Sequence, residues 1–219
     1  MDSLNINRIV QEIVLILPGF LLAVTVHEYT HGYIAYRLGD PTAKAAGRLT
    51  FNPISHLDPI GTLMLVVTRM IGWAKPVPVD PRYLRNPRSD MLWISLGGPA
   101  ANLITAVVLA VLLHGLVFFT GGRVTGQVTT FIVVPLYMIL LLGVRINVVL
   151  AIFNLIPVPP LDGAKILEGL LPPRQAYQFQ KLEPYGFIIL IALIFTDAVS
   201  YIILPPIRFI EALLLSGLR

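Results

Sequence analysis

Four long apolar stretches dominate the hydrophobic pattern of this chain, and polar or proline-rich segments separate them. They run from about Ile9 to Leu38, from after Asp90 to about Thr120, from about Thr130 to Phe153, and from about Tyr185 to Leu204. A helix needs about 20 residues to cross a bilayer core of roughly 30 Å, and each of the four stretches is at least that long. The pattern predicts an α-helical polytopic membrane protein with a bundle of about four to six transmembrane helices.

Prolines predict where two of these helices end. The third stretch breaks after Phe153 and resumes over residues 161–171. Pro205-Pro206 are expected to end the fourth helix, because proline removes a backbone donor and clashes with the preceding turn. Residues 207–218 are too short to cross the bilayer, so we expect them to lie in the interface or pack on the bundle.

Residues 39–89 follow a different pattern, in which glycines and prolines interrupt every regular run. Leu63–Ile71 is apolar but short, which favours a reentrant segment. Ala74–Val79 (AKPVPV) is predicted to be an extended edge strand, which could accept an added peptide strand; a plain loop is the alternative. We therefore expect a small membrane-associated β/reentrant region at 39–89.

Charge predicts the orientation of the chain. Eight Lys and Arg residues lie from Arg37 to Arg88, whereas the loop at 121–129 has only Arg123. Positive charge concentrates on cytoplasmic loops, so residues 39–89 are expected inside and both termini outside. The first ten residues include no basic region typical of a signal peptide, so the first apolar stretch is expected to be retained.

Composition agrees with a membrane location. The chain is 56% hydrophobic and 13% charged, against about 25% charged residues in a soluble domain. It has no cysteine, so any zinc must be held by histidine and carboxylate. The net charge of +4 is modest and suits a membrane surface better than nucleic acid, so no nucleic-acid partner is expected.

The candidate chemistry begins with His27-Glu28-Tyr29-Thr30-His31, at the inner end of the first apolar stretch. An H-E-x-x-H pattern on a helix places two imidazoles on one face, where both can bind one zinc ion. Glu28 can then take a proton from a water at the metal. Two structural histidines are the alternative, but ionisable residues inside an apolar span are usually functional.

A third ligand is needed, and Asp162 is the candidate. It lies in residues 154–163 (NLIPVPPLDG), where three prolines prevent a continuous helix. Irregular backbone at membrane depth persists where it is buried in protein or lines a wet cavity. Asp162 also precedes a half-helix, whose N-terminus favours negative charge. It could instead cap that helix, and the two roles are compatible.

Two asparagines are candidates for contact with a substrate. Asn102 ends Gly97-Gly98-Pro99-Ala100-Ala101-Asn102 and could donate to an oxyanion; an interhelical hydrogen bond is the alternative. Asn154 has the same two interpretations and is favoured for the substrate because it lies closer to Asp162. His56 is expected to support the site or the fold, and His114 to be structural.

The H-E-x-x-H motif together with N-x-x-P-x-x-x-L-D-G resembles the site-2 protease family of intramembrane zinc metalloproteases. The resemblance extends from about Leu21 to Leu171 and includes the GGPAAN segment and residues 52–62 (NPISHLDPIGT). It implies that His27, His31 and Asp162 bind zinc and that Glu28 is the catalytic base. Asn154 matches an asparagine implicated in substrate handling. Larger members carry a PDZ or CBS domain, and we expect neither in this compact, bacterial-type chain.

These observations predict that residues 1–219 form a single transmembrane protease domain in a bacterial inner membrane. The expected activity is zinc-dependent cleavage of a transmembrane segment in another membrane protein, as in regulated intramembrane proteolysis. The expected partners are a single-span membrane protein or a signal-peptide remnant, and membrane lipid; a homo-oligomer is left open. Val77 and Val79 are predicted to contact the substrate. A metal-binding membrane transporter is the alternative, although one H-E-x-x-H motif and no inverted repeat argue against it.

Overall fold

The computed structural model describes residues 3–68, 73–121, 126–127 and 129–218. Every named element within these ranges is a helix. The longer helices are α1 (Ser3–Arg37), α3 (Pro59–Thr68), α4 (Pro87–Thr120), α5 (Val134–Asn154), α6 (Asp162–Leu170), α7 (Pro173–Gln180), α8 (Gly186–Phe195) and α9 (Ala198–Leu214). The shorter ones are α2 (Thr42–Ala45), η1 (Pro53–His56), η2 (Pro81–Tyr83), η3 (Thr129–Val133) and η4 (Glu183–Tyr185).

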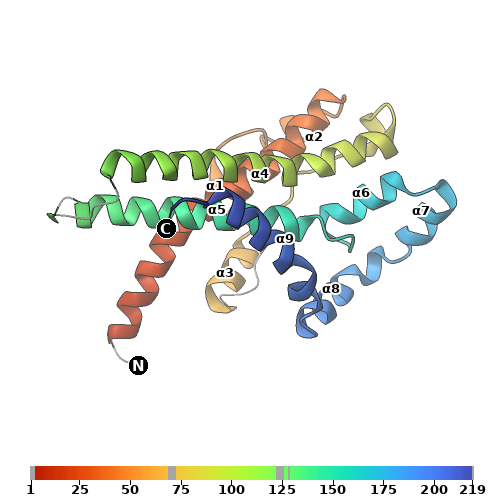
Figure 1. Ribbon diagram of the computed structural model, residues 1–219. Coiled ribbons are helices and arrows are strands. Elements are labelled where there is room, and N and C mark those ends of the chain that lie inside the picture. Colours follow the sequence, from red (N-terminus) through yellow and green to blue (C-terminus); the bar gives the residue numbers. More distant parts are fainter. Residues whose placement is uncertain (1–2, 69–72, 122–125, 128, 219) are drawn as a thin grey trace.

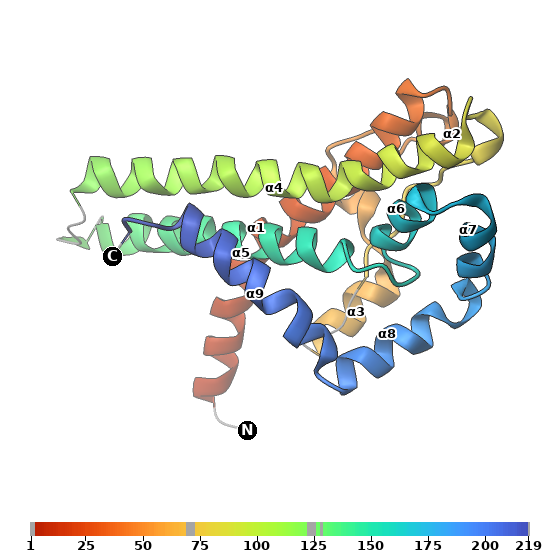
Figure 2. The same ribbon diagram turned by 45° about the vertical axis from the view of Figure 1, so that its right-hand side comes forward.

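Three helices form the centre of the molecule. Helices α4 and α5 lie side by side along most of their lengths, and α1 crosses them (Figure 1; Figure 2). The crossing of α1 and α5 is close, because a Cβ built on Gly19 would lie only 2.8 Å from Cα of Gly143. Small residues permit such backbone contact between helices in lipid, where burial of apolar surface gives little drive for association.

Four parts of the chain are long and apolar enough to cross a membrane: Val10–Arg37, Pro87–Thr120, Thr130–Asn154 and Pro173–Phe195. The first three coincide with the first three predicted spans. The break after Asn154 and the new helix at Asp162 also lie where the prolines of that segment predicted them. The prediction of an α-helical polytopic membrane protein is confirmed.

The prediction for the C-terminal part was wrong in detail. The fourth span ends at Phe195, and the chain turns at Asp197, which has a φ of 56°. Asp is one of the few non-glycine residues that adopts this left-handed conformation readily. Helix α9 then continues through Pro205 and Pro206 instead of ending there.

Packing explains why α9 tolerates its two prolines. Ile207, directly after them, is 5% exposed and belongs to the main apolar cluster. The other buried members come from α4 and α5: Ala106, Leu109, Ala110, Val144 and Val148. Figure 2 shows α9 returning along α5. Contacts on the bundle therefore hold α9 helical past the missing N–H groups, and the prediction that this segment packs on the bundle is confirmed.

The predicted β structure at 39–89 is a second correction. The described residues of this region form short helices and extended loops, and their β pairing is limited to an isolated antiparallel bridge between Leu57 and Ala74. Pro76 and Pro78 have no N–H for a strand ladder. Helix α3 is about 15 Å long and too short to cross a bilayer, as expected of the apolar run at 63–71. Residues 69–72 of that run lie outside the described residues.

Candidate metal centre and active site

Three side chains from two helices meet at the inner part of the bundle. His27 and His31 are one turn apart on α1, and Asp162 is the first residue of α6. Nε2 of His27 lies 3.0 Å from Nε2 of His31. Oδ2 of Asp162 lies 3.1 Å from the first nitrogen and 3.2 Å from the second. The structure thus brings together the three residues predicted as ligands, within described parts of the chain.

The other ring nitrogen of each histidine has an acceptor. Nδ1 of His31 lies 2.7 Å from the carbonyl oxygen of Ile94, which can only accept a hydrogen bond. Nδ1 of His27 lies 2.7 Å from Oδ1 of Asn102. Both imidazoles therefore carry a hydrogen on Nδ1 and direct Nε2, the atom that can bind a metal, toward Asp162. Metal-binding histidines are commonly oriented in this way by a partner behind the ring.

This donor set fits zinc. Three acceptor atoms face one another, and Oδ2 of Asp162 is buried without a hydrogen-bond donor. Such a group of lone pairs needs a cation between its members. Ligands about 2.0–2.1 Å from a tetrahedral zinc lie about 3.3 Å from each other, close to the separations observed. Two histidines and one carboxylate also leave a fourth position for water, as catalytic zinc sites require.

Helix α4 forms the wall behind the histidines. A Cβ built on Gly98 would lie 2.5 Å from Nε2 of His31 and 2.6 Å from Cε1 of His27. Glycine is therefore required for the two rings to pack directly on the α4 backbone. The GGPAAN segment thus shapes the metal site as well as the contact between helices.

Glu28 is buried beside the two histidines, with 9% of its surface exposed. Its Oε2 accepts a hydrogen bond of 2.8 Å from the backbone N–H of Val77. The segment predicted as an edge strand therefore lies against the candidate base.

The Asp162 side chain makes no helix cap, because Leu161 occupies the N-cap position.

Two buried charged groups hold the segment at 75–80 in place. The Arg48 guanidinium donates to the carbonyl oxygen of Lys75 at 2.6 Å, and Oδ2 of Asp40 accepts from the backbone N–H of Asp80 at 2.7 Å. Arg48 is 8% exposed and Asp40 is fully buried. At the surface, a hydrogen bond from Arg82 lowers the pKa of Asp80 below its ordinary value. The segment is thus anchored by side chains rather than by a sheet.

The two candidate asparagines have different surroundings. Asn102 is fully buried, and its amide nitrogen donates to the carbonyl oxygen of Ala23 and to Oδ1 of Asn147, both at 2.9 Å. Both amide hydrogens are thus used between helices, which is the alternative that the sequence left open. Asn154 donates to the carbonyl oxygen of Leu150 at 2.9 Å and is partly buried. A substrate contact by either residue stays a prediction.

The remaining histidines lie outside the metal group. His56 is fully buried and lies 2.8 Å from the carbonyl oxygen of Thr50, so it supports the loop region. His114 on α4 lies 2.9 Å from the carbonyl oxygen of Ser216 and joins α4 to the C-terminal end of α9.

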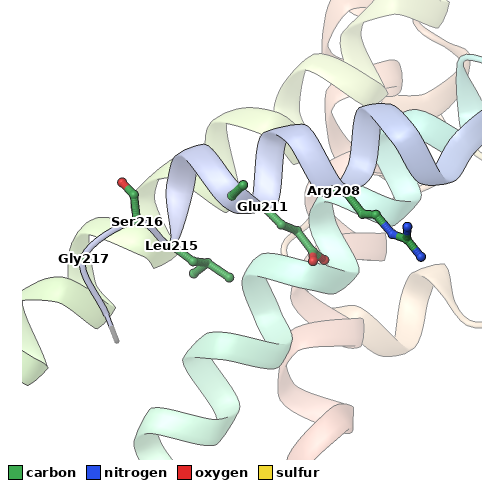
Figure 3. Close-up of a pocket in the computed structure, with 6 residues that line it drawn as sticks. Arg208, Glu211, Leu215, Ser216 and Gly217 are labelled. Atoms are coloured by element: carbon green, nitrogen blue, oxygen red, sulfur yellow. The ribbon is translucent and has the colours of Figure 1, made fainter.

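A surface hollow at the C-terminal end of α9, shown in Figure 3, is lined by Arg208, Glu211, Ala212, Leu215, Ser216 and Gly217. It includes none of the predicted site residues.

Sequence reasoning missed Asn147. It is fully buried on α5 and is linked to the metal site by its hydrogen bond to Asn102. The signal was present, since it is an amide in the apolar run LLGVRINVVL, and polar groups at such positions are usually paired or functional. The hydrogen bonds by which Asp40 and Arg48 hold the segment at 75–80 were also missed, because they join distant parts of the chain.

A bundle of membrane-spanning helices that holds two histidines, a carboxylate and an adjacent glutamate in this arrangement defines a membrane metallopeptidase. Comparison with known proteins agrees with that class. The model of the family described as "Peptidase family M50" matches residues 15–196, and the chain belongs to this family. The resemblance to site-2 proteases is confirmed, and the protein is a multi-pass zinc metalloprotease.

Curated relatives support the assignment over most of the chain. "Putative zinc metalloprotease YwhC" of Bacillus subtilis is 40% identical over 191 residues, which cover 86% of this chain and 83% of the relative. Rip2 of Mycolicibacterium smegmatis, whose name carries the same description, is 30% identical over 211 residues, 91% of this chain and 73% of the relative. No solved structure matches the chain.

Proposed function

We propose that this zinc metalloprotease cleaves a peptide bond in or near a transmembrane segment of another membrane protein. The observation that carries the proposal is the position of the site. His27, Glu28 and His31 lie on a helix that is apolar and long enough to cross the bilayer. All three are at most 9% exposed, so the site is enclosed by helices rather than open to the aqueous surface.

Each side chain has a defined part in the proposed reaction. His27, His31 and Asp162 would hold zinc, which when bound polarises a peptide carbonyl and acidifies water. Glu28 accepts a proton from the attacking water on its carboxylate and delivers it to the leaving amine nitrogen. The polar groups behind the histidines keep their Nε2 lone pairs directed at the metal.

The extended segment 74–79 is the proposed place where an unwound substrate lies. A helical substrate hides its carbonyl groups in hydrogen bonds and must unwind before it can be cut. The side chains of Val77 and Val79 face the protein, so contact would come through the exposed main-chain edge. No hydrogen bond from the N–H of Val79 is found within the described part of the chain, and the proposal assigns this group to pairing with the substrate.

The proposed setting is a bacterial inner membrane, with residues 39–89 on the cytoplasmic side. The density of Lys and Arg in that region supports this orientation. The proposed substrate is a single-span membrane protein or a signal-peptide remnant, cut in regulated intramembrane proteolysis. Lipid would surround the exposed apolar faces of the helices, and a homo-oligomer would bury part of them.

The test uses purified protein in liposomes with zinc and a single-span reporter whose fragments are identified by mass spectrometry. We expect cleavage within or beside the reporter's membrane segment. The Glu28→Gln variant should keep its zinc and cleave about 10²–10⁴-fold more slowly, the usual contribution of a general base. Cleavage only of water-soluble peptides would contradict the proposal. Equal zinc flux through vesicles of both proteins, without cleavage, would favour the transporter.

A further inference from the structure

A chain of hydrogen bonds links α5 to the metal site through α4. The amide nitrogen of Asn147 donates to the carbonyl oxygen of Gly143 at 2.8 Å, and its Oδ1 accepts from Asn102 at 2.9 Å. Asn102 in turn faces Nδ1 of His27 at 2.7 Å. Both asparagines are fully buried, and the hydrogen bonds found for Asn147 in the described part of the chain go to Asn102 and Gly143, not to the three predicted ligands.

The direction of every bond in this chain follows from its ends. The carbonyl oxygens of Gly143 and Ala23 can only accept, so each must face an amide nitrogen. Turning either amide over would place two oxygens against each other. The remaining atom of Asn102, Oδ1, therefore faces His27 and must receive a hydrogen from Nδ1.

We propose that Asn147 is a positioning residue for the zinc site, because it fixes the amide of Asn102 and thereby the Nδ1–H tautomer of His27. Asn102 has two amide hydrogens and, in this buried place, two acceptors: Ala23 and Asn147. Removing the acceptor on Asn147 leaves one hydrogen unpaired, and the Ala23 carbonyl alone then holds the orientation of the amide. The Nε2 atom of His27 would then be held less firmly toward His31 and Asp162.

This inference rests on the zinc site and not on the nature of the substrate, so its tests are binding and spectroscopy. The first uses wild-type protein without metal. Long-range proton–nitrogen NMR of histidine-labelled protein should show His27 with its hydrogen on Nδ1. A hydrogen on Nε2 of His27 would overturn the proposal, whatever the variants do.

The second test compares the zinc affinities of three variants by competition with a chelator. Asn147→Leu should bind zinc about tenfold more weakly, the lower end of the 10–100-fold effect of groups behind a ligand. Asn147→Asp should restore most of the affinity, because a neutral carboxyl can donate to Gly143 and accept from Asn102. Val144→Ala removes buried atoms one turn away on α5 and should leave the affinity unchanged.

Two results of this second test would also overturn the proposal. One is wild-type zinc affinity in a folded Asn147→Leu protein. The other is an equal loss of affinity in Asn147→Leu and Val144→Ala, since that would show only a general weakening of the bundle. Cleavage of a membrane reporter is not needed for either result, so failure here is distinct from failure of the proposed function.

Discussion

The backbone N–H of Val77 donates a hydrogen bond of 2.8 Å to Oε2 of Glu28, although 49 positions separate the two residues. A bond from an N–H to a carboxylate is stronger than one between neutral groups, and this one is buried. The extended segment and the candidate base are therefore physically coupled. A substrate that pairs with the segment would lie beside the group that moves the proton.

The first prediction concerns the metal ligands. The wild-type protein should bind one zinc per chain. Asp162→Ala and His31→Ala should each lower the zinc affinity by more than about 10–100-fold, the loss caused by removing a residue that supports a ligand from behind. Elemental analysis after dialysis against a chelator measures this. His114→Ala is the control, because that ring contacts carbonyl oxygens at the other end of α4. A full equivalent of zinc in Asp162→Ala would remove Asp162 from the ligand set.

The second prediction concerns the wall of the site. Gly98→Ala should keep α4 helical, since alanine favours a helix by about 1 kcal/mol over glycine, yet it should impair zinc binding. The reason is that its Cβ would collide with both histidine rings. Gly115→Ala on the same helix is the matched control, since a Cβ there meets nothing within 4 Å. Equal zinc contents for the two variants would refute the assignment of Gly98.

The ligands could be predicted from sequence because local geometry determines them. His27 and His31 are one helical turn apart, so any helix over the H-E-x-x-H motif brings them together. Asp162 required a further step, but the three prolines before it indicated a break at membrane depth. The first three membrane spans could be predicted equally well, because bilayer thickness sets their length.

The remaining features depend on packing between distant segments. Pro205 and Pro206 stay helical because Ile207 is held in the apolar cluster with α4 and α5. The extended form of 74–79 was predictable from its prolines, but its anchoring by Glu28 and Arg48 was not. Nothing in the local sequence tells an edge strand from a segment held by side chains. Asn147 is visible as an amide in an apolar run, but its contact with Asn102 on another helix could not be read from the local sequence.

The third prediction tests how the extended segment is held. Arg48→Met removes the buried donor to the carbonyl oxygens of Lys75 and Pro76 and should destabilise the segment by about 1–3 kcal/mol, the cost of leaving a buried acceptor without a hydrogen bond. Zinc should stay bound. Hydrogen exchange at the Val77 amide, followed by mass spectrometry, should become faster.

The exposed Arg82 offers a comparison for that experiment, because its ion pair is with Asp80 at the surface. Arg82→Met should leave exchange at Val77 unchanged. Unaltered exchange in Arg48→Met as well would mean that Arg48 is not needed to hold the segment beside its bonds to Glu28 and Asp40.

The fourth prediction tests orientation. The chain has no cysteine, so single substitutions can be labelled without background. Arg82→Cys and Arg88→Cys should react with an impermeant thiol reagent only after cells are permeabilised, because the cationic region is expected inside. Gln127→Cys, between α4 and α5 in the sequence, should react in intact cells. The reverse pattern would overturn the proposed topology.

The fifth prediction returns to Val77 and Glu28. Val77→Pro removes the N–H that Glu28 accepts, while proline suits an extended segment already flanked by Pro76 and Pro78. We expect zinc binding to be retained and KM for a membrane reporter to rise, since the segment would no longer be fixed beside the base. Pro78→Ala changes an exposed side chain, leaves the Val77 bond intact and should behave like wild type.

Photocrosslinking from Val79 in the Glu28→Gln background then tests whether substrate lies on the segment. Capture of substrate elsewhere near the zinc, but never from Val79, would leave the segment as a loop that orients Glu28.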